Sequence, residues 1–236
     1  MKTKTLCRYV RMLPVYGGIV LCTCCSGYQS VFDGQSLDGW EYDPVYWRVE
    51  NGCMVGEVTP ATLLSRNTFI IRKDLVLEDF ELKVEYRISE NGNSGVSYRN
   101  ERVADVPYAL KGYQADIDGR NQYTGQNYEE RGRQFLALRG QTVVIDSLYR
   151  SPSHQDVSAI DFQHDPLNRH IRKNDWNEYR IVAKGNRLQH YLNGVLASDV
   201  TDSDAANRRL SGLLGVQVHV GPPMKVEFRN FRIKSL

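Results

Sequence analysis

The sequence SGLLGVQVHVGPPMKVEFRNFRIKSL, residues 211–236, gives the clearest indication of the fold, because it has the pattern of two β-strands joined by a turn. Its first half alternates apolar and polar side chains, with Val216, Val218 and Val220 against Gln217 and His219. A period of two residues is typical of a strand with one buried face, so the glutamine and the histidine are expected to face a surface or a cleft. Gly221-Pro222-Pro223 then reverses the chain, because proline presets φ and glycine tolerates unusual dihedral angles.

The second half of this stretch is another strand, with a break in its phase. Val226 and Phe228 are expected to point inward, whereas Phe231 and Ile233 resume on odd-numbered positions. One residue near Asn230 must therefore be absorbed, which predicts a β-bulge.

The same alternation recurs along the chain and predicts a series of short strands. They are expected at 47–50, 53–58, 69–72, 80–88, 96–99, 112–118, 135–138, 142–145, 176–184, 188–192 and 195–200. Asn51-Gly52 suits the type I′ turn of a hairpin. Residues 176–200 read as a meander that the closing pair of strands completes.

The connections between these strands also bear on the fold. Residues 119–133 and 146–175 are long polar stretches, the second with one helical turn near 166–171, and both can form the rim of a cleft. A long helix, a βαβ rhythm and an internal repeat are not found in the pattern. The sequence therefore predicts an all-β fold, a concanavalin-A-like β-sandwich (jelly roll) with long polar loops.

Composition narrows the class of ligand. The 236 residues suit one large β domain, and 41% apolar with 25% charged residues is ordinary for a globular protein. The formal charge is +2, but residues 1–23 hold four basic side chains and no acid, and the remaining 26 basic and 28 acidic residues give about −2. A near-neutral body offers no electrostatic case for nucleic acid, so the ligand is expected to be small or uncharged.

The first residues have the pattern of a secretory signal. A basic start is followed by the apolar run 12–22, which is too short to span a membrane comfortably. Leu21-Cys22-Thr23 before Cys24 resembles a bacterial lipobox, with Cys25 as a competing lipidation site and cleavage with release as the alternative. We expect a lipoprotein signal peptide at 1–23, a tether at 24–29 and the folded domain at 30–236. The protein is then extracytoplasmic, periplasmic or at the outer membrane, and contacts the membrane through its lipid anchor alone.

Cysteine usage agrees with that compartment. Cys7, Cys22, Cys24 and Cys25 lie in the leader or at its junction, which leaves Cys53 in the body. A disulfide framework or a cysteine metal site is therefore not expected there.

Several ordered blocks resemble one known family. They are VFDGQSLDGW (31–40), FELKVEYRISENGNSGVSYR (80–99), GYQADID (112–118), YTGQNYEE (123–130) and GLLGVQVHVGPPMKVEFRNFRIK (212–234). Over about 30–236 the chain is similar to the 3-keto-disaccharide hydrolase domain family. The resemblance implies a concanavalin-A/laminin-G-like sandwich that acts on glycosides oxidised to a ketone at C3, by elimination and hydration or by net hydrolysis. Gln114 and Asp116 stand where the family commonly has Glu and Gln, which marks a variant branch.

The implied chemistry defines what a site must contain. A 3-keto group makes the C2 proton acidic, and the substituent at C1 can then depart as a group β to the carbonyl. Such a site needs a base near C2, a positive or hydrogen-bonding group at the C3 oxyanion, and an acid for the leaving group. The paired carboxylates of ordinary glycosidases are not required. A redox cofactor is not expected, because an upstream glycoside 3-oxidoreductase would supply the ketone.

Three residues are the catalytic candidates. His219 is the first choice for acid or base, since an unperturbed imidazole titrates near neutrality; the alternative is a solvent-facing strand histidine. Asp116 can act as base, as acceptor for a sugar hydroxyl or, with Asp118 and His219, as ligand of a possible divalent cation; the alternative is a solvated carboxylate. Arg99 can bind the keto oxygen through its planar fork, and its alternative is a salt bridge to an acid such as Glu85.

Further residues are candidates for binding substrate. Gln114, Gln217 and Asp118 share faces with the catalytic candidates, and Tyr128, Glu130 and Arg131 can close on the ligand from the first polar loop. Core anchoring is favoured over sugar stacking for Trp40, Trp47 and Trp176. Loop surface is favoured for His154, His164 and His170.

Three classes of function are compatible with these observations. The first is a hydrolase or lyase for 3-keto-glycosides, the second a non-catalytic carbohydrate-binding lipoprotein module, and the third an adhesion or scaffolding lipoprotein without a concave polar site. A binding module needs aromatic and hydroxyl-binding groups but no titrating base, so His219 and Asp116 discriminate between the first two. Motifs of a Ser or Cys nucleophile, a P-loop or a Rossmann site are not found.

Overall fold

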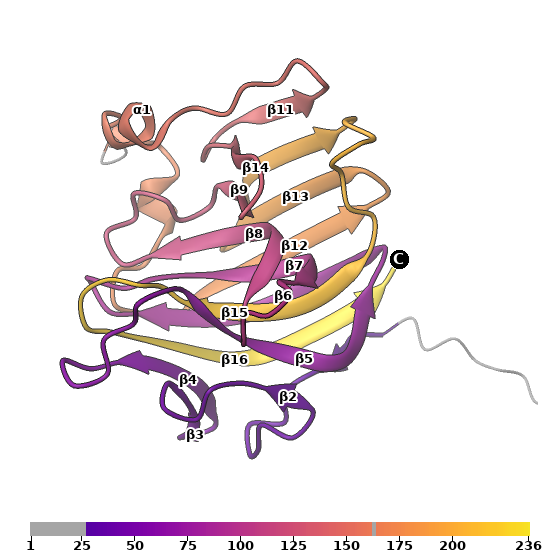
Figure 1. Cartoon of the computed structure of the whole chain (residues 1–236). Helices are drawn as coiled ribbons and strands as arrows, with labels where there is room; N and C mark the ends of the chain where they lie inside the picture. Colours follow the sequence, from indigo (N-terminus) through magenta and orange to yellow (C-terminus); the bar gives the residue numbers. More distant parts are fainter. Residues whose placement is uncertain (1–26, 162–163) are drawn as a thin grey trace, which may run out of the picture.

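The computed structural model describes residues 27–161 and 164–236, which form two β-sheets packed face to face (Figure 1). The nine-stranded sheet contains β1 (Gln29–Ser30), β3 (Trp47–Glu50), β4 (Cys53–Val58), β6 (Phe80–Ile88), β11 (Thr142–Ile145), β12 (Asn177–Lys184), β13 (Arg187–Leu192), β14 (Val195–Asp202) and β16 (Met224–Ser235). The seven-stranded sheet contains β2 (Trp40–Glu41), β5 (Thr68–Leu77), β7 (Asn93–Arg102), β8 (Leu110–Asp118), β9 (Asn127–Glu130), β10 (Gln134–Ala137) and β15 (Gly212–Val218). The predicted all-β sandwich is confirmed.

In the part of the chain that the structure describes, helical structure is confined to short pieces. They are α1 (His154–Ser158), which Ser153 and Asp156 close with a capping box, and the 3₁₀ turn η2 (Asn168–His170). The turn expected near 166–171 is confirmed, whereas α1 and the strand β9 fall in stretches predicted to be loops. None of the helices in residues 27–161 and 164–236 is long and apolar enough to cross a membrane. The predicted signal peptide, Cys24 and Cys25 lie outside the described residues.

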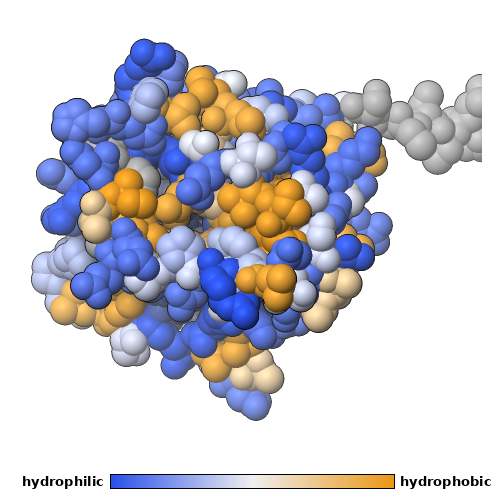
Figure 2. Space-filling view, turned by 90° about the horizontal axis from the view of Figure 1, so that it is seen from above, coloured by the Kyte–Doolittle hydropathy of each residue, from blue (hydrophilic) through white to orange (hydrophobic). Residues whose placement is uncertain are grey.

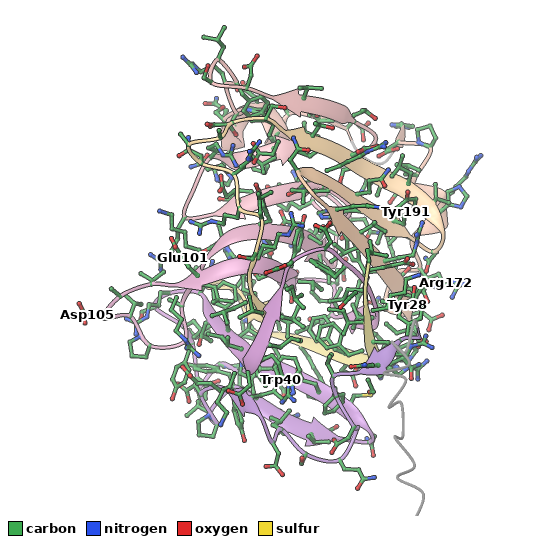
Figure 3. All side chains as sticks on the ribbon, turned by 90° about the vertical axis from the view of Figure 1, so that its right-hand side faces the viewer. Tyr28, Trp40, Glu101, Asp105, Arg172 and Tyr191 are labelled. Carbon is green, nitrogen blue, oxygen red and sulfur yellow. The ribbon has the colours of Figure 1, made fainter. Side chains whose placement is uncertain are left out.

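The sheets keep the strand order β11-β14-β13-β12-β6-β16-β4-β3 and β10-β9-β8-β7-β15-β5-β2, with β1 paired to β16. Figure 3 shows the two layers from the side, with Glu101 of β7 and Tyr191 of β13 at opposite sides of the molecule. Seen from above, the surface is mostly hydrophilic with separate hydrophobic patches (Figure 2).

The C-terminal stretch, residues 211–236, contributes one strand to each sheet. β15 lies between β7 and β5, and β16 lies between β6 and β4, so the closing pair is not a hairpin that extends the meander. The expected bulge is confirmed, because the register of β16 against β6 shifts between Arg229 and Arg232 and Asn230 has φ of 51°. Val220, expected to point inward, lies beyond the end of β15 and is 38% exposed.

The core lies between the sheets and follows the alternation of the sequence. On β6, Phe80, Leu82, Val84 and Tyr86 are buried, and on β8 the odd-numbered Tyr113, Ala115 and Ile117 are buried. The even-numbered residues of β8 therefore face away from the other sheet. This outer face of the seven-stranded sheet carries the candidate site.

The tryptophans divide between core and surface. Trp40 and Trp47 are buried in the core as expected. Trp176 is not a core anchor, because its ring lies half-exposed under two guanidinium groups, 3.8 Å from Arg229 and 5.0 Å from Arg87. Those arginines belong to the outer face of the nine-stranded sheet. The position of Trp176 could not be predicted from sequence, because its contacts are with charged side chains and not with apolar ones.

Candidate functional site

A pocket of about 440 Å³ opens on the outer face of the seven-stranded sheet. Most of the predicted site residues line it, namely Gln114, Asp116, Tyr128, Glu130, Arg131 and His219. The sequence analysis missed the other lining residues, namely Asn67, Asn93, Tyr123, Gln126, Phe135 and His154. The predicted residues come from β8, β9 and the chain that follows β9 and β15.

Strand register explains why these residues meet. Gln114 on β8 is paired with Ser97 on β7 and with Tyr128 on β9, and Asp116 is paired with Gly95. Directly paired residues in neighbouring strands direct their side chains to the same face. The even-numbered residues of β8 and β9 are thereby collected on the outer face and form the floor of the pocket.

Asp116 has the environment of a group that exchanges protons near neutrality. Gln114 Nε2 donates a hydrogen bond of 2.9 Å to Asp116 Oδ1, and Gln126 Nε2 donates one of 2.9 Å to Asp116 Oδ2. Burial outweighs these bonds and raises the pKa of Asp116 to about 7, and the charges of Glu130 and Asp118 act in the same direction. A carboxyl group with such a pKa in a pocket is suited to general acid or base catalysis.

The amide of Gln114 is held in one orientation. Its Oε1 accepts a hydrogen bond of 3.0 Å from Ser97 Oγ, so its Nε2 is directed at Asp116. The side chain lies across Gly95, where an added Cβ would come within 2.5 Å of Gln114 Cδ. The missing side chain of Gly95 is therefore what makes room for this hydrogen bond.

His219 lies at the edge of the pocket with a defined tautomer. Its Nδ1 donates a hydrogen bond of 2.6 Å to the carbonyl oxygen of Val220, which leaves the lone pair of Nε2 free to accept a proton. Its main-chain N–H donates to the carbonyl oxygen of Asn93 at 3.2 Å. Burial lowers the pKa of His219 below its usual 6.5, and the nearby His154 adds to this effect, so the neutral imidazole dominates at pH 7.

Glu130 is a second buried carboxyl group in the pocket. Burial raises its pKa, and this is opposed by a 3.3 Å hydrogen bond from Asn67 Nδ2, by the charge of Arg131 and by the amide of Gln217. Gln217 itself is fully buried and is not a wall of the pocket, and its amide nitrogen and oxygen have no hydrogen-bond partner among the described residues. It is expected to support the pocket wall and not to contact ligand.

Aromatic rings form one wall of the pocket. Phe135 lies 4.8 Å from the ring of His154, 5.2 Å from that of Tyr128 and 6.5 Å from that of Tyr123. His154 is exposed at the surface, as expected, and it also lines the pocket, because the first turn of α1 places its ring against Phe135. Aromatic rings of this kind provide flat apolar surface against which a sugar ring can stack.

Arg99 is a correction to the predicted site. Its side chain is buried away from the pocket, and its guanidinium donates to the carbonyl oxygens of Glu78, Gly185 and Arg209 and to the carboxylate of Asp79. The strand β7 changes register between Tyr98 and Glu101, and Arg99 itself has φ of 51°, which turns its side chain away from the face of Ser97. The expected alternative, a salt bridge to an acid, is confirmed with Asp79 as the partner at 3.1 Å, whereas Glu85 pairs with Arg229.

Asp118 is not a wall of the 440 Å³ pocket, although it lines a depression beside it. Its carboxylate accepts hydrogen bonds from the backbone N–H groups of Gln122, Tyr123 and Thr124 and from the hydroxyl of Thr124. The carboxylate thereby stabilises the turn after β8, outside the 440 Å³ pocket. In residues 27–161 and 164–236 no group of three or more His, Cys, Asp or Glu side chains could hold a metal ion. The possible cation bound by Asp116, Asp118 and His219 therefore has no preformed site there.

Known proteins resemble this chain in both sequence and fold. A family model described as the 3-keto-alpha-glucoside-1,2-lyase-like domain matches residues 27–234. A 3-keto-disaccharide hydrolase of Bacteroides thetaiotaomicron is 30% identical over 91 residues, which cover 33% of this chain and 29% of the relative, so the matched segment spans less than a third of that relative.

Solved structures share the fold at low identity. A protein of Parabacteroides distasonis whose assignment as a glycosyl hydrolase is provisional has a TM-score of 0.59 at 19% identity, covering 89% of this chain and 94% of the other. The carbohydrate-binding module CBM66 of Bacillus subtilis has a TM-score of 0.56 at 18% identity, covering 84% and 96%. These likenesses support the sandwich fold, which hosts both enzymes and binding modules.

Proposed function

The chain belongs to the 3-keto-alpha-glucoside-1,2-lyase-like domain family, and we propose that it cleaves the glycosidic bond of sugars that carry a ketone at C3. The observation that carries the proposal is the pair formed by Asp116 and His219, two titratable groups that line one pocket. Burial raises the pKa of Asp116 to about 7 and lowers that of His219 below its usual 6.5. A carbohydrate-binding module needs no such pair.

The proposed reaction is an elimination followed by hydration. A base removes the proton from C2, the electron pair forms the C1–C2 double bond, and the C1–O bond breaks while an acid gives a proton to the departing oxygen. Water then adds to C1 and a proton returns to C2. The products are the free alcohol or sugar and the 3-keto sugar, with one water consumed.

The position of each residue supports a role for it in this reaction. Asp116 is at the floor of the pocket and takes the C2 proton as carboxylate, whereas His219 is at the edge and delivers a proton from Nε2 to the glycosidic oxygen. The pair is active when it holds one proton. The form with that proton on His219 is the less populated one, because burial raises the pKa of Asp116 and lowers that of His219.

Other lining residues supply binding and charge. Arg131 lines the pocket and is proposed to stabilise the oxyanion at C3, the role expected of Arg99 from sequence. Tyr128 and Phe135 offer the stacking surface, and the amides of Asn67 and Asn93 face the pocket as partners for sugar hydroxyls.

The test measures product release from a panel of 3-keto-glucosides and the parent glucosides, with wild type, His219→Ala and the matched control His164→Ala, whose ring is exposed on the second polar loop. Cleavage of the keto substrates alone, lost with His219→Ala and kept with His164→Ala, supports the proposal. Loss of turnover on adding a chelator would add a metal to the mechanism. Binding of sugars without any turnover would favour the carbohydrate-binding module instead.

The setting of the reaction is also a proposal. An upstream glycoside 3-oxidoreductase would supply the ketone, and lipidation of Cys24 would hold the enzyme at a membrane outside the cytoplasm. Fractionation of cells that express wild type, Cys24→Ala or Cys25→Ala tests the anchor. Release of the Cys24→Ala protein into the soluble fraction is expected, whereas release of Cys25→Ala alone would move the anchor to that residue.

A further inference from the structure

Two shallow depressions continue the pocket along the surface. The first, of about 290 Å³, shares Asn93, Tyr123 and His219 with the pocket. The second, of about 320 Å³, shares Glu90 and Arg120 with the first depression. The three spaces therefore adjoin one another in a row, and each neighbouring pair has common walls.

The order of these spaces fixes the direction of the substrate, if the proposed function holds. Asp116 lines the pocket and neither depression, so the keto sugar whose C2 proton it removes must occupy the pocket. His219 is a wall of both the pocket and the first depression, which places the glycosidic oxygen at their boundary. The leaving group must then extend into the first depression.

The walls of the depressions suit a polyhydroxylated ligand. Gln122 and Glu90 line the first depression, and Lys173 and Asn174 line the second. These side chains offer both donors and acceptors, as hydroxyl groups require. Val220 and Pro222 add exposed apolar surface beside them, which suits the C–H face of a sugar ring.

Arg120 is fixed at the boundary between the two depressions. Its Nη2 donates a hydrogen bond of 3.0 Å to Asn91 Oδ1, which leaves further guanidinium donors for a ligand. The preceding residue, Gly119, donates its main-chain N–H to the carbonyl oxygen of Gly92 at 2.9 Å, and a Cβ at Gly119 would come within 2.0 Å of the carbonyl oxygen of Ser89. The backbone beside Arg120 is thereby pinned against the turn that follows β6.

From this continuity we propose that the leaving group is a sugar chain of at least two units and that Arg120 is a specificity-determining residue for its length. The first unit occupies the depression beside His219 and the second occupies the depression beside Lys173. Arg120 contacts the chain where the two units join. The inference rests on the proposed function and extends it from disaccharides to longer glycosides.

The experiment compares kcat/KM for a 3-keto disaccharide and for the trisaccharide that carries the ketone on its non-reducing terminal unit. Both substrates expel a sugar hydroxyl, so their intrinsic reactivity is alike, and α-1,4 and β-1,4 series are both used. Wild type is expected to prefer the trisaccharide by about tenfold in at least one series, the worth of one or two hydrogen bonds. Arg120→Ala is expected to bring that ratio close to one.

Arg102→Ala is the matched control, since Arg102 is an exposed arginine at the far end of β7 and pairs with Glu41. It should keep the wild-type ratio. A ratio near one in wild type, with both substrates turned over, overturns the inference and leaves the proposed function standing. A high ratio that survives Arg120→Ala overturns the role of Arg120 and with it the proposed path of the chain. Turnover of neither substrate contradicts the proposed function, and the inference falls with it.

Discussion

Replacing Asp116 by Asn should make the protein more stable at alkaline pH while it abolishes turnover. The folded protein raises the pKa of Asp116 from its usual 3.8 to about 7, because burial disfavours the charged form. The folded state therefore binds this proton more tightly than the unfolded state does. Stability falls as the pH rises from 3.8 to about 7 and is constant, at its lowest, above that range.

The size of the effect follows from the two pKa values. A difference of about three units corresponds to about 4 kcal/mol of destabilisation above pH 7. At pH 5 about a third of that cost is present, so the advantage of Asp116→Asn should grow by about 3 kcal/mol between pH 5 and pH 8. The new amide can be accommodated, because Gln126 Oε1 has no hydrogen-bond partner and can accept from it once the Gln126 amide turns over.

Urea unfolding at pH 5 and pH 8 measures this difference without any substrate. The control is Asp105→Asn, at an exposed loop position visible in Figure 3, which should show no such pH dependence. Turnover of a 3-keto-glucoside by Asp116→Asn should drop on the order of 10²-fold or more. If the stability difference does not grow with pH, Asp116 is not a carboxyl group strained by burial, and its choice as the proton-exchanging residue is refuted.

Further predictions concern the rest of the site. The pH profile of wild-type kcat/KM should be bell-shaped, with an acid limb below pH 6.5 from His219 and a basic limb near pH 7 from Asp116. In His219→Gln only the ionisation of Asp116 remains, so kcat/KM should rise through about pH 7 as that carboxyl group loses its proton. An unchanged bell in that variant would assign the acid limb elsewhere. In Gly95→Ala the added methyl group should push Gln114 away from Asp116, so that the carboxylate loses a hydrogen-bond donor. The value of kcat/KM should fall by about tenfold, and the basic limb should move to higher pH because the pKa of Asp116 rises. An unmoved limb would show that Gln114 does not set this pKa. Arg99→Met should destabilise the fold by about 3–5 kcal/mol in urea unfolding and leave kcat/KM of the folded protein unchanged, since Arg99 only ties loops together; a stable but inactive variant would restore its catalytic role.

Much of the site could be predicted because it lies on regular strands. The alternation of β8 separates Tyr113, Ala115 and Ile117 from Gln114 and Asp116 without reference to any partner strand. His219 could be found by continuing the same alternation past the last residue of β15. In each case one strand, read alone, shows which residues share a face.

The remaining site residues depend on tertiary contacts or on local backbone shape. Asn67 and His154 reach the pocket from distant loops, and nothing in their local sequence indicates this position. Arg99 was misplaced because the irregularity in β7 that turns its side chain has no glycine or proline to mark it. Asp118 lies beside the pocket and not in it, because its carboxylate binds the backbone of the turn that follows, a local use that the period-two pattern cannot distinguish from exposure.

The placement of β15 and β16 has a consequence for how the protein is made. Each is an interior strand of its sheet, so β7 and β6 lack a neighbour until residues 212–235 have been synthesised. Neither sheet can be completed before then, although pairs such as β7–β8 and β12–β13 can form earlier. For a chain that we propose is exported, late completion of both sheets favours translocation across the membrane in an unfolded state. A stop codon that removed β16 alone would leave the nine-stranded sheet divided between β6 and β4, and such a product should be cleared by proteases instead of accumulating as a smaller domain.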